Sequence, residues 1–179
     1  VNEFGDVQYS ARDLCSALPK ILDRERSRRA FCTMGLTMHD IFNRHPGFFV
    51  AGLGNSVECS GVFSFHRGHP RFYEDGFDRS CNDSDRQHIF LRAAKVLIHE
   101  LGHIFGLPHC QYYLCLMNGA NHSGEVERTP LYFCPVCLAK LHDALKLDLV
   151  RYFEEIRDFW HEHGFPALER FYCDRLEPR

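Results

Sequence analysis

Short apolar runs separated by polar turns fill the first half of the chain, a pattern that predicts strands. The run from residue 30 to 41 reads AFCTMGLTMHDI, is rich in strand formers and ends near a polar turn. Two shorter runs at Phe48–Val50 and Val62–Phe65 are bounded by glycines and a proline, and each predicts a short strand. Residues 68–84 are polar and contain glycine and proline, so a loop is expected there.

Apolar residues recur at helical spacing near both ends of the chain. Ser10 is placed to cap a helix whose leucines continue to Leu22, and Pro19 either kinks this helix or begins a second segment. From Pro135 onward a helical pattern resumes and includes Trp160. The C-terminal part is therefore predicted to be helical.

The longest predicted helix lies in the middle of the chain. Asp83 or Ser84 caps it, and it should end at Gly106, a residue type that favours the left-handed conformation after a helix. Residues 107–133 show little periodicity. Strands followed by helices favour an α+β fold whose site lies where the two halves meet.

The composition suits a compact chain of 179 residues, of which 45% are hydrophobic. The formal charge is −3, with 21 basic and 24 acidic residues well interspersed, which argues against nucleic acid or an acidic membrane surface as a partner. No apolar run reaches the length of a membrane span. Residues 1–6 are polar and mixed in charge, unlike a signal peptide, and scattered thiols beside one tight cysteine cluster favour a reducing compartment, so a cytoplasmic location is expected. A monomer is expected as well.

The central helix contains the sequence His99-Glu100-Leu101-Gly102-His103. Residues four apart lie on one helix face about one turn apart, so both imidazoles can reach a single metal ion. Glu100 lies about 100° round the helix from His99, close enough to contact a metal-bound water without being a ligand. Taken alone, the motif is also compatible with an ordinary helix face that carries two partly buried histidines and a surface glutamate.

An extension of this motif strengthens the metal interpretation. Gly106 and His109 follow at the spacing H-E-x-x-H-x-x-G-x-x-H. A continuing helix would carry His109 to the wrong side, whereas a left-handed glycine reverses the chain and returns a third imidazole to the ion. Pro108 stiffens this return by favouring an extended Leu107. Three neutral nitrogens leave zinc a fourth position for water, which is typical of a catalytic site.

These residues predict a zinc-dependent metallopeptidase. Zinc lowers the pKa of its bound water to about 7, and Glu100 accepts the proton as general base. The hydroxide attacks a peptide carbonyl that the same ion polarises, and Glu100 then passes the proton to the leaving amine. This mechanism needs no serine or cysteine nucleophile.

Nine cysteines are present, and four of them lie close together in the sequence. The close set has the spacing C-x4-C…C-x2-C, which suits a tetrahedral structural zinc site formed by Cys110, Cys115, Cys134 and Cys137. Such a site would fix the irregular loop against the start of the C-terminal helix. Two disulfides, free thiols and an iron–sulfur cluster are the alternatives. Together with the catalytic ion, this predicts two zinc ions per chain.

The combined pattern resembles the metzincin clan of zinc peptidases and, within it, the archaemetzincin family. The resemblance depends on the long histidine motif, a cysteine directly after the third histidine and a second cysteine five residues later. Met117 in Cys-Leu-Met-Asn and the Cys-Pro-Val-Cys sequence that begins at Cys134 complete it. Softer matches are Gln8–Ala11, the segment 35–37 and Val62–Phe65.

The resemblance implies a zincin topology, with a twisted mixed sheet, an active-site helix across its face and a helical C-terminal subdomain. It divides the chain into an N-terminal subdomain at 1–106 and a C-terminal subdomain at 107–179. It implies that Met117 forms a hydrophobic base under the histidines in a Met-turn without binding the ion. It also implies that one strand pairs antiparallel with bound substrate, for which Gly61–His66 is the candidate. Gly119 stands where some metzincins have a tyrosine, so stabilising the tetrahedral intermediate falls to zinc and other groups.

A hydrolase that acts on peptides is the leading hypothesis. Its competitor is a zinc-stabilised peptide-binding or regulatory module that has kept the ligands and lost turnover. Glu100 favours the enzyme, because it contributes nothing to metal binding and a degenerate site would be free to lose it. A nucleic-acid-binding zinc module is disfavoured, because no basic stripe flanks the cysteines.

Overall fold

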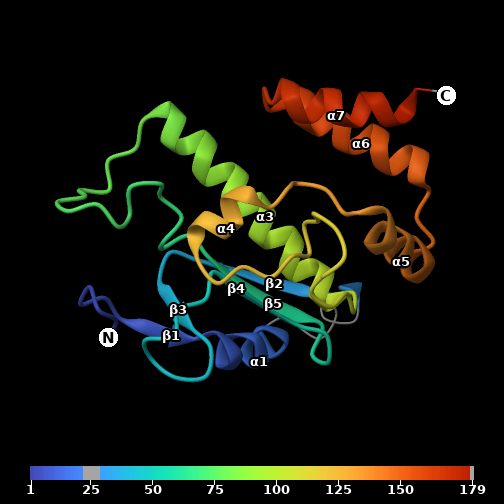
Figure 1. Cartoon of the computed structure of the whole chain (residues 1–179). Coiled ribbons are helices and arrows are strands. Elements are labelled where there is room, and N and C mark those ends of the chain that lie inside the picture. The colour runs from blue at the N-terminus through green and yellow to red at the C-terminus, as the bar shows by residue number, and fades with distance from the viewer. Residues whose placement is uncertain (22–28, 178–179) are drawn as a thin grey trace. The chain divides into compact units, whose positions relative to one another are not determined.

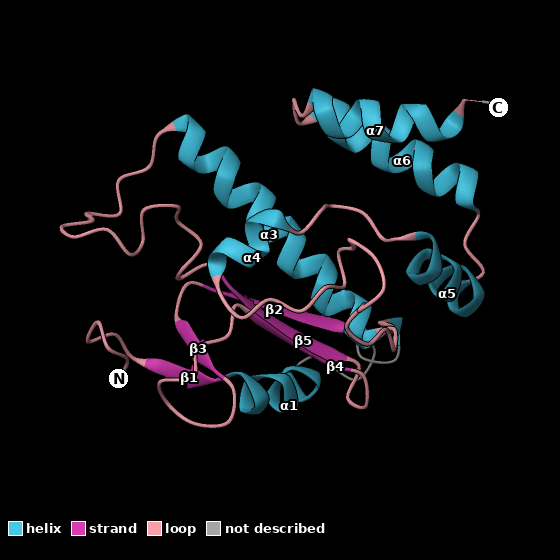
Figure 2. Ribbon diagram, in the orientation of Figure 1, coloured by secondary structure: helices cyan, strands magenta, loops and turns pink. Residues whose placement is uncertain are grey.

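The computed structural model describes residues 1–21 and 29–177 of the chain. Contacts between residues divide it into two compact units, Val1–Tyr132 and Phe133–Arg179. The predicted boundary after residue 106 separates the two sides of an active-site cleft, whereas the units described here are defined by contacts within each unit. That boundary therefore stays a prediction. The fold is mixed α+β, with the strands and the longest helix in the first unit (Figures 1 and 2).

Two small sheets form the strand-bearing part of the first unit (Figure 2). In the mixed three-stranded sheet, β5 (Ser60–Ser64) is central, with β2 (Thr33–Thr37) parallel on one side and β4 (Gly52–Asn55) antiparallel on the other. The second sheet pairs β1 (Gln8–Ser10) parallel with β3 (Asp40–Phe42). Every residue of β5 is buried, as expected of a central strand covered on both faces.

The two faces of the three-stranded sheet carry different residues. Leu53 of β4 and Val62 of β5 pack with Cys15 of α1 (Ala11–Ile21) in a buried apolar cluster. The alternate positions of β4 are glycines, and a side chain at Gly54 would meet the long helix α3 (Asp83–Ile104). Because successive strand residues point to opposite faces, α1 and α3 cover opposite sides of the sheet. The glycines therefore let the sheet approach α3 closely.

The strand predictions are only partly correct. The run 30–41 forms two strands in different sheets rather than one, because the chain turns between Thr37 and Asp40. The strand predicted at Phe48–Val50 is wrong, since only an isolated bridge between Phe42 and Phe49 forms there. The strand at Val62–Phe65 is confirmed as β5, whereas the glycine-rich β4 was not predicted.

The helix predictions agree more closely with the structure. Ser10 accepts a hydrogen bond from the Asp13 amide at the start of α1, which contains Pro19, while Leu22 lies outside the described residues. The cap of α3 is Asn82, one residue before the predicted start, and it forms a reciprocal capping box with Asp85. The loop predicted before this helix is confirmed.

Helices also form the second unit and one segment that was predicted to be irregular. The short helix α4 (Ser123–Arg128) was not predicted. The C-terminal helical pattern is confirmed, but it is divided into α5 (Pro135–Leu145), α6 (Leu149–Glu162) and α7 (Pro166–Leu176). Lys146 in the left-handed conformation ends α5. Within the described residues, no helix combines the length and apolar character that crossing a membrane requires.

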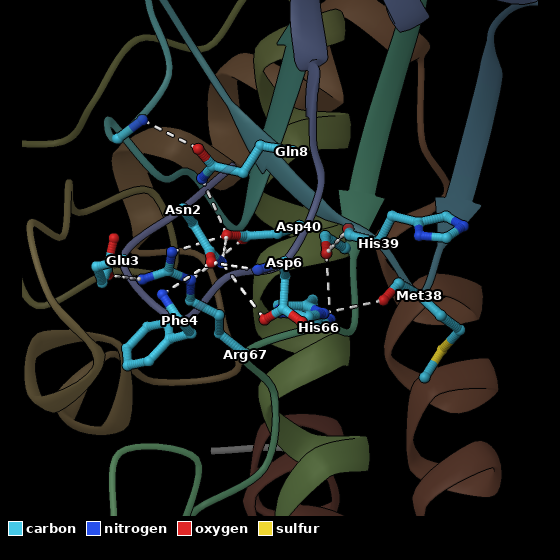
Figure 3. A network of polar contacts seen from close by, with 12 residues as sticks. Asn2, Glu3, Phe4, Asp6, Gln8, Met38, His39, Asp40, His66 and Arg67 are labelled. Carbon is cyan, nitrogen blue, oxygen red and sulfur yellow. Dashed lines mark hydrogen bonds and ion pairs between the residues drawn. The ribbon is translucent and has the colours of Figure 1, made fainter.

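A buried ion pair links the N-terminal segment to β3 and to the loop after β5 (Figure 3). Asp40 is fully buried and accepts hydrogen bonds of 3.1 and 2.7 Å from Arg67. Asn2 and Gln8 donate to the same carboxylate at 2.7 and 2.9 Å. Burial alone would raise the pKa of Asp40, but these hydrogen bonds, first those from Arg67, hold the pKa below its ordinary value. The guanidinium also lies 4.2 Å from the centre of the Phe49 ring.

Candidate active site and metal centres

The C-terminal half of α3 presents His99 and His103 toward each other. The Nδ1 atom of each ring forms a hydrogen bond of 2.8 Å with a backbone carbonyl. The partner of His99 is the Leu116 carbonyl, and that of His103 is the Leu107 carbonyl. A carbonyl only accepts hydrogen bonds, so Nδ1 carries the proton and Nε2 keeps its lone pair. The two Nε2 atoms lie 3.0 Å apart. Backbone acceptors therefore orient both rings with their basic nitrogens facing one point.

A turn at Gly106 brings His109 to the same point. Gly106 has a φ of +85°, and the Leu107 amide donates to the Gly102 carbonyl at 2.9 Å, which reverses the chain after α3. The His109 ring centre lies 5.2 Å from that of His99 and 4.9 Å from that of His103. One nitrogen from each of the three rings lies within 4.8 Å of the others. The predicted convergence of the three imidazoles is thus present in the structure.

Burial keeps the helical histidines neutral, which is the protonation state that a metal ligand needs. It lowers the pKa of His99 to about 4, and it lowers the pKa of His103 as well. The chemistry of this donor set, three imidazoles with one nitrogen of each close together, fits a zinc ion.

Glu100 lies beside the histidines and is almost fully buried, with 8% of its surface exposed. A side chain at Gly52 would come within 2.7 Å of Glu100 Cγ, so the carboxylate lies directly against β4. Burial raises the pKa of Glu100 to about 7, and a hydrogen bond from the Gly54 backbone opposes part of this rise. The carboxyl group therefore has a proton affinity suited to acid–base chemistry near neutral pH.

The loop after α3 packs against the helix segment that carries His99 and His103. Met117 is fully buried, and a side chain at Gly102 would run into its sulfur. The Cys110 amide donates to the Met117 carbonyl at 2.8 Å. Asn118, whose role the sequence analysis missed, donates to the Cys110 carbonyl at 2.7 Å and accepts from the Cys115 amide at 2.8 Å. Its position directly after Met117 was the available signal, because asparagine commonly bonds to nearby backbone in tight turns.

The four clustered cysteines also come together. Their sulfur atoms lie within 4.8 Å of one another, and all four side chains are buried. Backbone amides approach two of the sulfurs, that of Met117 at 3.5 Å from Cys115 and that of Cys137 at 3.4 Å from Cys134. Four buried sulfurs, two of which accept N–H hydrogen bonds, fit a closed tetrahedral zinc site.

A further cluster of possible ligands was not predicted and consists of His69, Cys81 and Asp85. His69 Nδ1 accepts a hydrogen bond from the Arg71 amide at 3.0 Å, so the proton resides on Nε2, which lies 3.0 Å from the Ser80 carbonyl. Asp85 serves the capping box of α3 and binds Arg71 at 3.0 Å. Both ring nitrogens of His69 and the Asp85 carboxylate thus have partners within the protein, and these contacts stabilise the start of α3.

A cleft with a volume of about 620 Å³ opens along α3 and β4. It contains all three histidines and Glu100, and β4 lines it with Gly52, Leu53 and Gly54. None of the residues 61–66 lines it, because β5 is the central strand of its sheet. The prediction that Gly61–His66 pairs with substrate is therefore wrong, because β5 already has a neighbouring strand on each side, whereas β4 is an edge strand of this sheet and lines the cleft. The rest of the cleft is lined by Asn43, Phe49, Val50, Ala51, Ser56, Lys95, Val96, Gly106, Leu107, Pro108, Leu116, Asn118, Ala120, Asn121, His122, Val126 and Thr129.

The contact between β4 and α3 gives a first prediction, for the substitution Gly54→Ala. The added Cβ would run into the Glu100 carbonyl oxygen and lie 3.1 Å from His103 Cβ. Because the oxygen belongs to the backbone of α3, the clash can be relieved only by moving the helix or the strand. We expect the free energy of unfolding to fall by roughly 1–3 kcal/mol, measured by urea denaturation. The matched control is Gly124→Ala in α4, where the nearest atom is a His122 side-chain nitrogen at 3.3 Å. Equal stability of the two variants would contradict the close packing of strand and helix.

Comparison with known proteins identifies the family. A model of peptidase family M54 matches residues 4–143. Archaemetzincin-2 of Pongo abelii is 36% identical over 169 residues, which cover 84% of this chain and 46% of that protein, so the chain spans about half the length of such relatives. Archaemetzincin of Pyrococcus furiosus is 33% identical over 158 residues, covering 83% of this chain and 72% of that protein.

A solved structure agrees with these sequence matches. The crystal structure of archaemetzincin from Methanopyrus kandleri superposes with a TM-score of 0.62 at 30% identity, covering 78% of this chain and 67% of that chain. The family match includes the histidine motif and all four clustered cysteines. The chain therefore belongs to peptidase family M54, the archaemetzincins, a family of zinc metallopeptidases.

Proposed function

We propose that this chain hydrolyses peptide bonds, with His99, His103 and His109 as ligands of a catalytic zinc ion and Glu100 as general base. The observation that carries the proposal is the convergence of three imidazole nitrogens beside a buried carboxyl group in an open cleft. When bound, zinc supplies a Lewis acid that polarises the substrate carbonyl and makes water more acidic. Three protein ligands are the number typical of a catalytic zinc site, and the architecture proposed is that of a metzincin.

Glu100 is the residue we propose to move the proton. It follows a proposed ligand directly in the helix, and its carboxyl group is held between α3 and β4 at the wall of the cleft. From there a carboxylate oxygen can take a proton from the attacking water and return it to the leaving amine. The tight contact with Gly52 limits the positions that the side chain can adopt.

The edge strand β4 is proposed to bind the peptide backbone. In the described residues, β4 pairs with β5 on one side, and no strand pairs with its other edge. Residues of β4 line the cleft, so a ligand in the cleft could reach this edge. An extended peptide can add to such an edge through main-chain hydrogen bonds, and we propose that it runs antiparallel to β4. This binding mode positions a peptide carbonyl over Glu100 without requiring a particular side chain.

The cysteine cluster is proposed to hold a second, structural zinc ion. Its four sulfurs fill a tetrahedral shell, so no position remains for substrate. Met117, buried against Gly102, is proposed as the hydrophobic base of the histidine site in a Met-turn. Both features would hold the loop that carries His109.

Metal content gives a second prediction. Native mass spectrometry of the chain purified with zinc is expected to find two ions per chain. Cys134→Ser should remove one ion and lower the thermal stability, because a structural zinc contributes directly to folding. Cys173→Ser, outside both clusters, is the control and should keep two ions. An intact chain that binds a single ion would contradict the assignment of one of the two sites.

A fluorogenic peptide library tests the function itself. The zinc-loaded chain should cleave some of its members, and removal of zinc with a chelator should stop the cleavage. A chain that holds both ions, binds peptides and cleaves none would instead support the peptide-binding module.

A further inference from the structure

Lys95 lies on α3 four residues before His99, so both side chains lie on the same face of the helix, and both line the cleft. Lys95 Nζ donates hydrogen bonds to two backbone carbonyls, that of Val126 at 3.1 Å and that of Glu127 at 2.8 Å. An ammonium group has three donors, so one remains after these two contacts. The two carbonyls therefore hold a cation in place at the wall of the cleft.

No neighbouring carboxylate of the described residues contacts the Lys95 ammonium directly. The nearby Glu127 side chain is bound by Arg92 at 2.8 Å and by His88 at 3.0 Å. Among the described residues, no carboxylate forms an ion pair with Lys95, and Glu100 is the one acidic residue that lines the cleft. Burial lowers the pKa of Lys95, and the nearby Glu127 carboxylate opposes part of this shift without contacting the ammonium. A carboxylate that binds in the cleft would give Lys95 a direct ion-pair partner.

The position of Lys95 relative to β4 indicates which side of a bound peptide would lie near the ammonium group. Gly52 faces Glu100 and Gly54 faces His103, so β4 and α3 run in the same direction past each other. Lys95 therefore lies toward the residues that precede Gly52. A peptide antiparallel to β4 would run with its C-terminal side in this direction. Four helical residues rise about 6 Å, roughly the length of two residues of extended chain.

We propose that Lys95 is a specificity-determining residue that binds a substrate carboxylate located one or two residues after the scissile bond. The inference rests on the proposed function and names its substrate class, peptides with a negative charge on the C-terminal side of the cleaved bond. The carboxylate has two sources, an acidic side chain or the free C-terminus of a short peptide. The chemistry is the same in both, a charge-assisted hydrogen bond from Nζ.

The test uses the zinc-loaded chain with two series of fluorogenic peptides. In the first series, one of the two residues after the scissile bond is Glu or Gln, and the C-terminus is amidated. In the second, the peptide ends two residues after the scissile bond with a free carboxylate or an amide. We expect kcat/KM to be about tenfold higher for the carboxylate member of at least one series, mainly through a lower KM. The series that shows the preference identifies the source.

Variants assign the preference to Lys95. Lys95→Gln should bring the ratio of kcat/KM between carboxylate and neutral peptides close to 1, whereas Lys95→Arg, which keeps the charge, should retain most of it. Lys140→Gln, an exposed lysine on α5, is the matched control and should leave the ratio unchanged. No preference in either series, or a preference that persists in Lys95→Gln, would overturn the inference.

Binding measurements separate this inference from the proposed function. If the zinc-loaded wild type cleaves no peptide, the proposed function fails, and the same peptide pairs are then compared by fluorescence anisotropy. A lower Kd for the carboxylate member that disappears in Lys95→Gln would still support Lys95 as the binding group. Equal Kd values for the two members would refute it.

Discussion

Glu100→Gln is expected to lower kcat/KM for peptide hydrolysis by about a thousandfold, in keeping with the 10²–10⁴-fold contribution of general acid–base catalysis. Glutamine keeps the size of the side chain, which matters because Glu100 is buried and packed against Gly52. The amide cannot accept a proton from water or return one to the leaving amine. Because Glu100 is not proposed as a ligand, native mass spectrometry should still find two zinc ions per chain.

The control for this substitution is Glu58→Gln, the same chemical change at an exposed residue that accepts a hydrogen bond from Ser16. Its kcat/KM should match that of the wild type. If Glu100→Gln keeps more than about a tenth of the wild-type rate with both ions bound, Glu100 is not the general base.

Asp40→Asn is expected to lower the free energy of unfolding by about 3–5 kcal/mol, the cost typical of removing one partner of a buried ion pair. The side chain of Arg67 is 5% exposed, so the variant removes the buried partner of the guanidinium and leaves it paired only with the half-exposed Glu3 carboxylate. The loss should appear in urea denaturation at neutral pH. Asp143→Asn is the control, because its ion pair with Lys146 is exposed, and it should change the stability little.

The effect of Asp40 has a defined pH dependence. The folded-state pKa of Asp40 lies below its ordinary value, so its contribution is fully present above the unfolded pKa of about 4 and is lost as the pH falls through the folded value. The stability difference between wild type and Asp40→Asn should therefore be constant above about pH 5 and shrink on acidification. Replacing both partners, Asp40→Leu with Arg67→Met, should recover much of the loss. A difference that grows on acidification would contradict the ion pair.

The geometry of the candidate site was largely predictable, because short-range helix rules govern it. The spacing of His99 and His103 places both on one helix face, and Gly106 adopts the positive φ that returns His109. The four cysteines come together as their spacing predicted. Their roles as ligands stay predictions.

The parts that could not be predicted depend on contacts between distant segments. The edge strand β4 contains two glycines, which are poor strand formers, and they are explained only by the close approach of α3. Phe49 and Val50 of the apolar segment line the cleft instead of forming a strand. The position of the Lys95 ammonium depends on carbonyls more than thirty residues away in the sequence, which local periodicity does not encode.

The most direct test of the central claim is anomalous diffraction at the zinc absorption edge from crystals of the zinc-loaded chain. We predict one peak about 2.0–2.1 Å from a ring nitrogen of each of His99, His103 and His109, with no fourth side chain of the chain bound to it. A second peak is expected among the four cysteines. A histidine cluster without a peak, or a fourth side chain that completes its coordination, would contradict the proposed hydrolytic site.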